Sequence, residues 1–163
     1  MTNLEIHSIS IKLYKIKFFL VLLFLQLIIG GFVSGMDAGK IYNTWPLMGS
    51  NYFPDDSNIN QFFSITLFDN PSLVQFIHRN LGYLIVFIYV LLLIDIYRNQ
   101  NKNFHLPILI IGLILLIQIV LGVTTVLSGV KILYASLHQI NSILIILSTL
   151  YLLYISKYKS KSC

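Results

Sequence analysis

Four long apolar runs, separated by polar segments, dominate the hydrophobic pattern of the chain. They cover residues 18–35, 73–95, 106–127 and 132–155. Each run reaches or approaches the ~20 residues that an α-helix needs to cross a lipid bilayer. The pattern therefore predicts an all-α membrane protein, with a single domain over residues 1–163 in which four transmembrane helices pack as a bundle.

The polar segment between the first two runs, residues 36–72, is long and rich in turn-forming residues. Near its end, Asn70 and Pro71 form a helix-start signal, because Asn caps a helix well and Pro is favoured at the first helical position. We therefore expect the second helix to begin close to residue 71. The aromatic-rich stretch 58–68 is expected to lie along the membrane surface.

Most basic residues flank the apolar runs on one side of the predicted membrane. Three lysines precede the first run, Arg98 and Lys102 separate the second from the third, and three lysines follow the fourth. The positive-inside rule then places both termini in the cytoplasm and segments 36–72 and 128–131 outside. A rival interpretation of the first run is a cleaved signal peptide, because a lysine precedes its apolar core and small residues (GGFVSG) end it.

Composition and charge support the membrane class. Hydrophobic residues make up 56% of the chain and charged residues 10%, whereas soluble domains carry roughly 25% charged residues. The net charge of +5 is explained by the flanking clusters, so nucleic-acid binding is not expected. A single cysteine, Cys163, excludes an internal disulfide framework and a cysteine-based metal centre in a monomer.

The first and third runs share a short pattern. "QLIIGGFVSG" begins at Gln26 and "QIVLGVTTVLSG" begins at Gln118, and both the glutamines and the following Gly30 and Gly122 are 92 residues apart. The second and fourth runs share another pattern, in "FIHRNLGYLI" and "SLHQINSILI". The sequence therefore predicts two tandem two-helix repeats in the same orientation.

The second shared pattern places one histidine in each repeat, His78 and His138, followed four residues later by a small residue, Gly82 or Ser142. Each histidine lies five or six residues into its span, which corresponds to roughly 8 to 9 Å below the outer boundary at 1.5 Å per residue. The two histidines are therefore at the same depth. In a pseudo-symmetric bundle they can face each other across the axis.

Two facing histidines within a membrane are candidates for metal binding, although a lone histidine in a span is usually a hydrogen-bonded packing residue. Zinc would want further N, S or O ligands, and no Cys, Asp or Glu lies at that depth in these spans. A haem iron needs only two axial ligands. Gly82 and Ser142, one turn deeper on the same helix faces, leave room for a flat macrocycle. The pattern favours haem ligation by His78 and His138.

Arg79 follows the first histidine and is a candidate partner for a haem propionate; an arginine that reaches toward lipid headgroups is the alternative. Lys131 is a second candidate for the propionate. Gln26 and Gln118 are expected to form hydrogen bonds between helices or to line the pocket.

Three segments resemble the C-terminal half of the haem A synthase family: "GGFVSGMDAGKIYNTWPLMG" at 30–49, "NPSLVQFIHRNLGY" at 70–83 and "LHQIN" at 137–141. Enzymes of this family have eight membrane helices in two similar halves, each with a histidine pair. The N-terminal half is thought to hold haem O and a catalytic loop carboxylate, and the C-terminal half a b-type haem. The reaction oxidises a methyl group of haem O to the formyl group of haem A, for cytochrome oxidase.

The resemblance implies that His78 and His138 are the axial ligands of haem b in an oxidoreductase of the cell inner membrane, and it assigns no catalytic residue to this half. The four other helices of the family, with their histidine pair and carboxylate, have no counterpart in this sequence. We therefore expect a truncated enzyme, a separate complementary four-helix chain, or a homo-oligomer. Haem O would be the substrate and haem A the product of the reaction, which that other half would carry out.

Two other functions stay open at this stage. One is an autonomous bis-histidine b-type cytochrome that transfers electrons in the membrane without oxidising haem O. The other is a small transporter or structural subunit, in which the two histidines are packing residues. An upstream reading frame with four more spans and its own histidine pair would favour the synthase.

Overall fold

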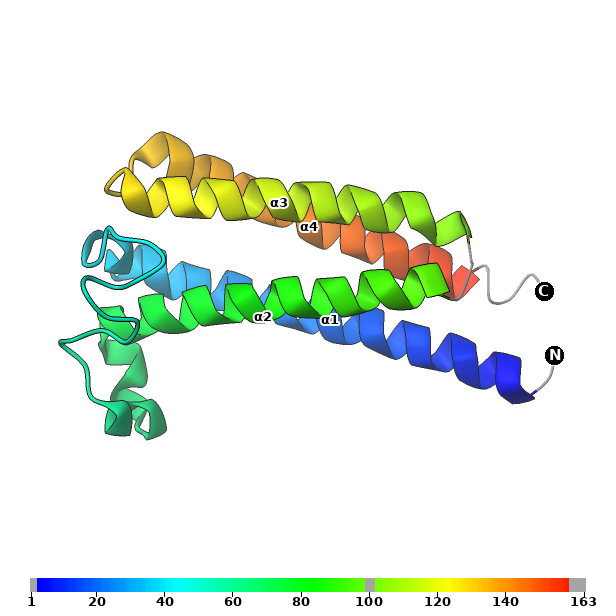
Figure 1. Cartoon of the computed structure of the whole chain (residues 1–163), viewed down its shortest axis with the longest axis horizontal. Coiled ribbons are helices and arrows are strands. Elements are labelled where there is room, and N and C mark those ends of the chain that lie inside the picture. Colours follow the sequence, from blue (N-terminus) through cyan, green and yellow to red (C-terminus); the bar gives the residue numbers. More distant parts are fainter. Residues whose placement is uncertain (1–2, 99–101, 159–163) are drawn as a thin grey trace.

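The computed structural model describes residues 3–98 and 102–158 (Figure 1). Its four long helices are α1 (Asn3–Gly35), α2 (Pro71–Arg98), α3 (His105–Leu127) and α4 (Ile132–Tyr158). Short 3-10 helices lie in the connections: η1 (Ala38–Lys40), η2 (Ile59–Phe63), η3 (Ile65–Asp69) and η4 (Lys102–Phe104). The described residues contain no β-strand, so the all-α prediction is confirmed.

Each long helix contains a segment long and apolar enough to cross a membrane. The predicted membrane protein with four transmembrane helices is therefore confirmed. The helices also extend beyond the apolar runs: α1 begins at Asn3, although its apolar span begins at Leu13. The hydrophobic pattern marks the part of a helix that can lie in the membrane, not the ends of the helix itself.

The helices form two antiparallel hairpins, α1 with α2 and α3 with α4, which pack on each other mainly through α1 and α4 (Figure 1). The long connection between α1 and α2 lies at one end of the bundle, and α1 begins and α4 ends at the other. Near that second end, Lys15 of α1 forms an ion pair with Asp95 of α2, with Nζ 3.1 Å from Oδ1.

The start of α2 follows the predicted signal. Pro71 is the first helical residue, and the side-chain oxygen of Asn70 accepts hydrogen bonds from the backbone N–H groups of Ser72 and Leu73, at 3.0 and 3.2 Å. These bonds satisfy donors that a helix leaves unpaired in its first turn. The cap places His78 two turns into α2.

The apolar core fills the half of the bundle far from the long connection. It draws on the first parts of α1 and α3 and the last parts of α2 and α4. In the other half, the helix faces that meet between the hairpins carry Gln26, Gly30, His78, Gln118 and His138, all partly buried. The apolar core therefore ends before it reaches the level of the two histidines. Its buried members are Ile16, Phe19, Leu22, Leu23, Ile85, Tyr89, Leu92, Ile96, Phe104, Ile108, Ile111, Leu115, Ile145, Ile146 and Leu152.

A tyrosine fastens the two hairpins together within this core. The hydroxyl of Tyr89 in α2 donates a hydrogen bond to the carbonyl oxygen of Ile108 in α3, at 3.0 Å. Its ring lies against Gly112, one turn further along α3; a Cβ there would be 2.8 Å from Cζ of the tyrosine and closer still to its hydroxyl oxygen. Gly112 therefore provides the notch that lets α2 and α3 approach.

The long connection is tied to the start of α2 through Asp56. Its carboxylate accepts hydrogen bonds from the hydroxyls of Ser72 (2.6 Å), Ser57 (3.1 Å) and Tyr42 (3.2 Å). Partial burial raises the pKa of Asp56, but these hydrogen bonds outweigh the burial and hold the pKa below its ordinary value of 3.8. The ionised carboxylate therefore stabilises the loop.

Acid is expected to loosen this loop. A carboxyl group with a lowered pKa in the folded state contributes stability above its unfolded pKa and loses it as the pH falls through the folded value. The loop should therefore stay attached at neutral pH and loosen below about 3.8, the ordinary value. Trp45, the one tryptophan of the chain, lies in this loop and reports the change by fluorescence.

Asp56→Asn should show the loosened fluorescence already at neutral pH. The matched control is Asp69→Asn, which removes a loop carboxylate outside this set of hydrogen bonds. An acid transition unchanged in Asp56→Asn would contradict the role of this carboxylate.

Candidate haem site

His78 of α2 and His138 of α4 face each other between the two hairpins. Their ring centroids are 6.4 Å apart and the ring planes are inclined by 69°. Deeper on the same two helix faces, Ile85 of α2 and Ile145 of α4 are buried in the core. The structure therefore brings the two predicted ligands together, at the level where the apolar core ends.

A glutamine side chain contacts each histidine from the neighbouring helix of the same hairpin. Nε2 of Gln26 lies 3.3 Å from Nε2 of His78, and Nε2 of Gln118 lies 3.3 Å from Nε2 of His138. An amide nitrogen only donates, so each imidazole Nε2 must be the accepting, unprotonated nitrogen. An unprotonated imidazole nitrogen is the form of histidine that binds metals, and here its lone pair accepts a hydrogen bond from the glutamine amide.

Second contacts fix which way each amide points. Nε2 of Gln26 also donates to the backbone oxygen of His78 at 3.1 Å. Oε1 of Gln118 accepts from the amide of Asn141 at 2.8 Å, and Asn141 donates as well to the carbonyl of Ile114 at 3.0 Å. The predicted role of the two glutamines in hydrogen bonding between helices is confirmed, and each bonds to a histidine-bearing helix.

The two imidazoles differ in how their second nitrogen is held. Nδ1 of His138 lies 3.2 Å from the backbone oxygen of Gln118 and donates to it, since Nε2 is the acceptor. Nδ1 of His78 is buried and finds no hydrogen-bond partner among the described residues. A backbone carbonyl on the far nitrogen is the usual device that orients a metal-binding histidine. His138 has this support in full.

Two glycines let the histidine rings lie close to the neighbouring helices. A Cβ at Gly122 of α3 would lie 2.9 Å from Cε1 of His138, and a Cβ at Gly30 of α1 would lie 3.2 Å from Cε1 of His78. The small residues below the histidines have other neighbours. Gly82 faces the Gln26 amide, and the hydroxyl of Ser142 donates to the carbonyl of Gln139 at 2.6 Å.

Arg79 turns toward the long connection. Its Nη1 donates to the carbonyls of Thr44 (2.9 Å) and Leu47 (3.2 Å), and its Nη2 donates to the carbonyl of Tyr42 (3.0 Å). Its Nε is buried and has no hydrogen-bond partner among the described residues. Lys131, the second propionate candidate, is exposed in the turn between α3 and α4.

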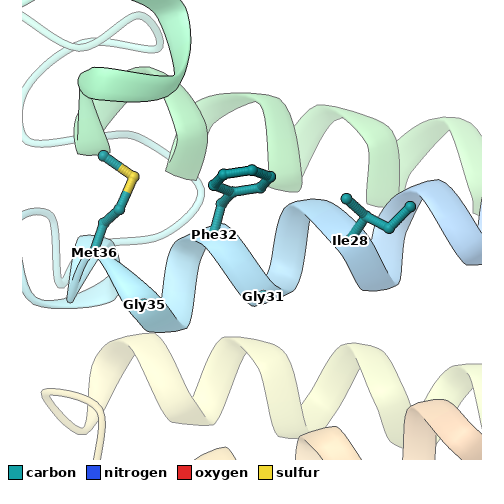
Figure 2. A pocket seen from close by; sticks show the side chains of 5 residues that line it. All are labelled: Ile28, Gly31, Phe32, Gly35 and Met36. Carbon is teal, nitrogen blue, oxygen red and sulfur yellow. The ribbon is translucent and has the colours of Figure 1, made fainter.

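An apolar groove of about 330 Å³ lies on α1 and is separate from the histidine pair. In Figure 2, the side chains of Ile28, Phe32 and Met36 line it, together with Gly31 and Gly35. Phe32 packs against Phe68 of η3, with ring centroids 5.2 Å apart. No polar side chain lines this groove, so it offers no metal ligand.

Among the side chains that the structure describes, no cluster of three or more His, Cys, Asp or Glu residues is able to hold a metal ion. The described residues therefore offer a pair of imidazoles, at most, to an ion in the bundle. Such a pair suits a metal that brings its other ligands with it, as haem iron does.

Comparison with known proteins places the chain. A family model described as "Cytochrome oxidase assembly protein" matches residues 10–150, most of the chain. The chain belongs to this family. Among its relatives, "Heme A synthase" of Pelagibacter ubique is 42% identical over 156 residues, which are 93% of this chain and 46% of the relative. "Heme A synthase" of Wolbachia pipientis is 40% identical over 140 residues, 86% of this chain and 38% of the relative.

The resemblance to the haem A synthase family is therefore confirmed. The chain spans less than half the length of these two curated relatives, which is consistent with the predicted C-terminal half. No solved structure matches the chain. Within the cytochrome oxidase assembly protein family, the geometry above is thus that of a four-helix portion.

Sequence reasoning missed three residues that position His78 and His138 or the glutamines that contact them. Asn141 holds the Gln118 amide, and Gly30 and Gly122 admit the imidazole rings. The equal spacing of Gln26–Gly30 and Gln118–Gly122 was the available signal. A glutamine and a glycine four residues apart share a helix face, so both are expected to contact the same side chain of the neighbouring helix.

Proposed function

We propose that this chain is the haem b-binding half of a haem A synthase and takes part in the oxidation of haem O to haem A. The facing of His78 and His138 across the two hairpins carries the proposal. The relatives named heme A synthase supply the reaction class, an oxidoreductase of haem A biosynthesis. The bound haem would supply an iron that cycles between ferrous and ferric states.

The spacing of the two rings supports axial ligation. An imidazole nitrogen binds a first-row metal ion at about 2.0–2.1 Å, so the ring centres of two imidazoles on opposite sides of one ion are roughly 6 Å apart. The centroids of His78 and His138 are 6.4 Å apart. The measured separation of the two rings is therefore close to the one that a single ion between two imidazoles requires.

The residues around the pair would hold and orient the ligands. The carbonyl of Gln118 fixes the tautomer of His138, and Gly122 and Gly30 keep space beside the rings. The Nε of Arg79, which has no hydrogen-bond partner among the described residues, is a donor for a propionate at the outer mouth of the site, with Lys131 as the second candidate. The buried core below the histidines excludes water from the inner side.

The partner in this proposal is the other half of the enzyme, supplied by a complementary four-helix segment, by a separate chain or by a second copy. That half would bind haem O and carry out the oxidation, in the cell inner membrane. An autonomous b-type cytochrome is the alternative, favoured by the fact that both histidines of the pair come from this one chain. Haem A formation in cells that express the chain with and without a complementary half separates the two.

Loss of either histidine is expected to abolish the bis-histidine haem. The purified wild-type chain should give a reduced-minus-oxidised spectrum of a low-spin b-type haem, because two imidazoles fill both axial positions. His78→Ala and His138→Ala should lose this spectrum. The matched control is His105→Ala, a histidine that stacks on Tyr97 at the start of α3, with ring centroids 4.3 Å apart.

Two results would contradict the proposal. A wild-type chain that incorporates no haem in the membrane would remove both the synthase and the cytochrome interpretations. Haem that survives both substitutions would show that other residues are the ligands.

A further inference from the structure

Arg79 immediately follows His78, and its guanidinium group binds the loop rather than a carboxylate. We propose that Arg79 is a positioning residue that fastens the strap, residues 39–47, across the outer mouth of the bundle, and that the strap sets the separation of the two hairpins and hence of His78 and His138. The inference rests on the proposed function only for the identity of the histidine site. The hydrogen bonds from which the inference is argued do not depend on the proposed function.

The first fastening is the bond pattern of Arg79. Three carbonyl oxygens of the strap, from Tyr42, Thr44 and Leu47, accept from its two terminal nitrogens at 2.9 to 3.2 Å. Gln75, one turn earlier on α2 and only 2% exposed, donates to the same Tyr42 carbonyl at 3.0 Å. A planar guanidinium can bind several carbonyls at once, and hydrogen bonds from a charged donor are about twice as strong as neutral ones.

The second fastening lies on the other hairpin. The amide of Asn43 in the strap donates to the carbonyl of Val126 near the end of α3, at 3.1 Å, and to the carbonyl of Gly39 at 2.8 Å. Gly39 is buried against Val130 in the turn between α3 and α4; a Cβ at Gly39 would lie 2.9 Å from a methyl carbon of that valine. The strap therefore joins the outer end of α2 to the outer end of the α3–α4 hairpin.

The position of this connection matters because the apolar core lies elsewhere. The buried cluster holds the hairpins together at the inner half, below the histidines. At the outer half, the contacts described above between strap and hairpins bridge the two histidine-bearing halves. Because the strap bridges the outer ends of the two hairpins, it limits how far His78 and His138 can separate.

Spin labels can measure this separation directly. Leu84 on α2 and Leu133 on α4 are 42% and 62% exposed and accept labelled cysteines, with Cys163→Ser as background. The full chain in lipid nanodiscs should give one narrow distance distribution. Arg79→Lys, Arg79→Gln and Asn43→Ala should each add a second, longer population, because each removes one fastening.

The matched control is Arg98→Gln, which removes an exposed arginine at the inner end of the same helix. Arg79→Lys is the decisive variant, because lysine keeps the positive charge but lacks the planar guanidinium that can bind several carbonyls at once. A wild-type distance distribution in Arg79→Lys would overturn the proposal in favour of a simple charge at the membrane interface. Unchanged distances in Asn43→Ala would equally overturn the bridge to α3.

A second readout uses the haem-loaded chain. The strap variants should bind carbon monoxide in the reduced form, because a longer separation leaves a fraction of the iron with one axial ligand, whereas wild type and Arg98→Gln should not. The distance measurement needs no haem. If the chain binds no haem but the strap variants show the longer population, the proposed function is contradicted and the role of the strap is supported. If the chain binds haem but the strap variants leave the distances unchanged, the role of the strap is contradicted and the proposed function is not.

Discussion

Replacing Gly122 by alanine is expected to remove most of the bound haem, because the new methyl carbon would lie 2.9 Å from Cε1 of His138. That distance is below the normal approach of two carbon atoms. The ring cannot simply swing away, since its Nδ1 is bonded to the Gln118 carbonyl on the same helix as Gly122. Overpacking of this kind costs typically 1–3 kcal/mol, which corresponds to roughly 5- to 150-fold weaker binding.

A second variant with a weaker expected effect and a control variant with no expected effect make the test specific. Gly30→Ala should have the same effect in weaker form, because its Cβ would lie 3.2 Å from Cε1 of His78. Gly31→Ala, the next residue on α1, should leave the haem content unchanged, since no side chain lies within 4 Å of its added Cβ. The measurement is haem per protein by pyridine haemochrome spectra. Equal haem in all three variants would contradict the role of the glycines.

Gly112→Ala is expected to destabilise the whole bundle. An added methyl group would overlap the hydroxyl of Tyr89 and force the ring out of its notch. The hydrogen bond to the Ile108 carbonyl would break, leaving a buried donor unsatisfied. Overpacking and a lost buried hydrogen bond together cost about 2–5 kcal/mol of the free energy of unfolding.

Unfolding in increasing SDS, followed by circular dichroism, measures this loss. Gly35→Ala is the matched control, because nothing lies within 4 Å of a Cβ at that position. Tyr89→Phe removes the hydroxyl alone and should cost about 0.5–1.5 kcal/mol, the usual net contribution of one hydrogen bond. A Gly112→Ala variant as stable as wild type would show that the notch is not close-packed.

The sequence predicted the helices well and their ends less well. Apolar runs and the Asn70–Pro71 signal placed the four helices and the start of α2, because both are local properties of the chain. The part of α1 that precedes its apolar run was not predicted, because the hydrophobic pattern marks only the membrane-spanning part of a helix. Topology relative to the membrane and the two-helix repeat stay predictions.

The meeting of the two histidines could be predicted from the sequence, but the residues that contact them could not. Equal depth of His78 and His138 in antiparallel hairpins is a matter of counting residues, and the structure brings the two rings together. The bonds of Arg79 to three loop carbonyls depend on how a long connection folds back, which no local pattern encodes. The assignment of Arg79 or Lys131 to a propionate therefore stays a proposal.

The glutamine contacts have a consequence for biogenesis. Each imidazole Nε2 has a single lone pair, and a Gln26 or Gln118 amide can use it. The same lone pair cannot serve an amide and an iron atom at once. Cofactor insertion would therefore exchange two hydrogen bonds, each contributing about 0.5–1.5 kcal/mol, for two bonds to metal. Folding in the bilayer and cofactor delivery can thus be successive steps, with the glutamines keeping the histidines neutral and correctly oriented until delivery.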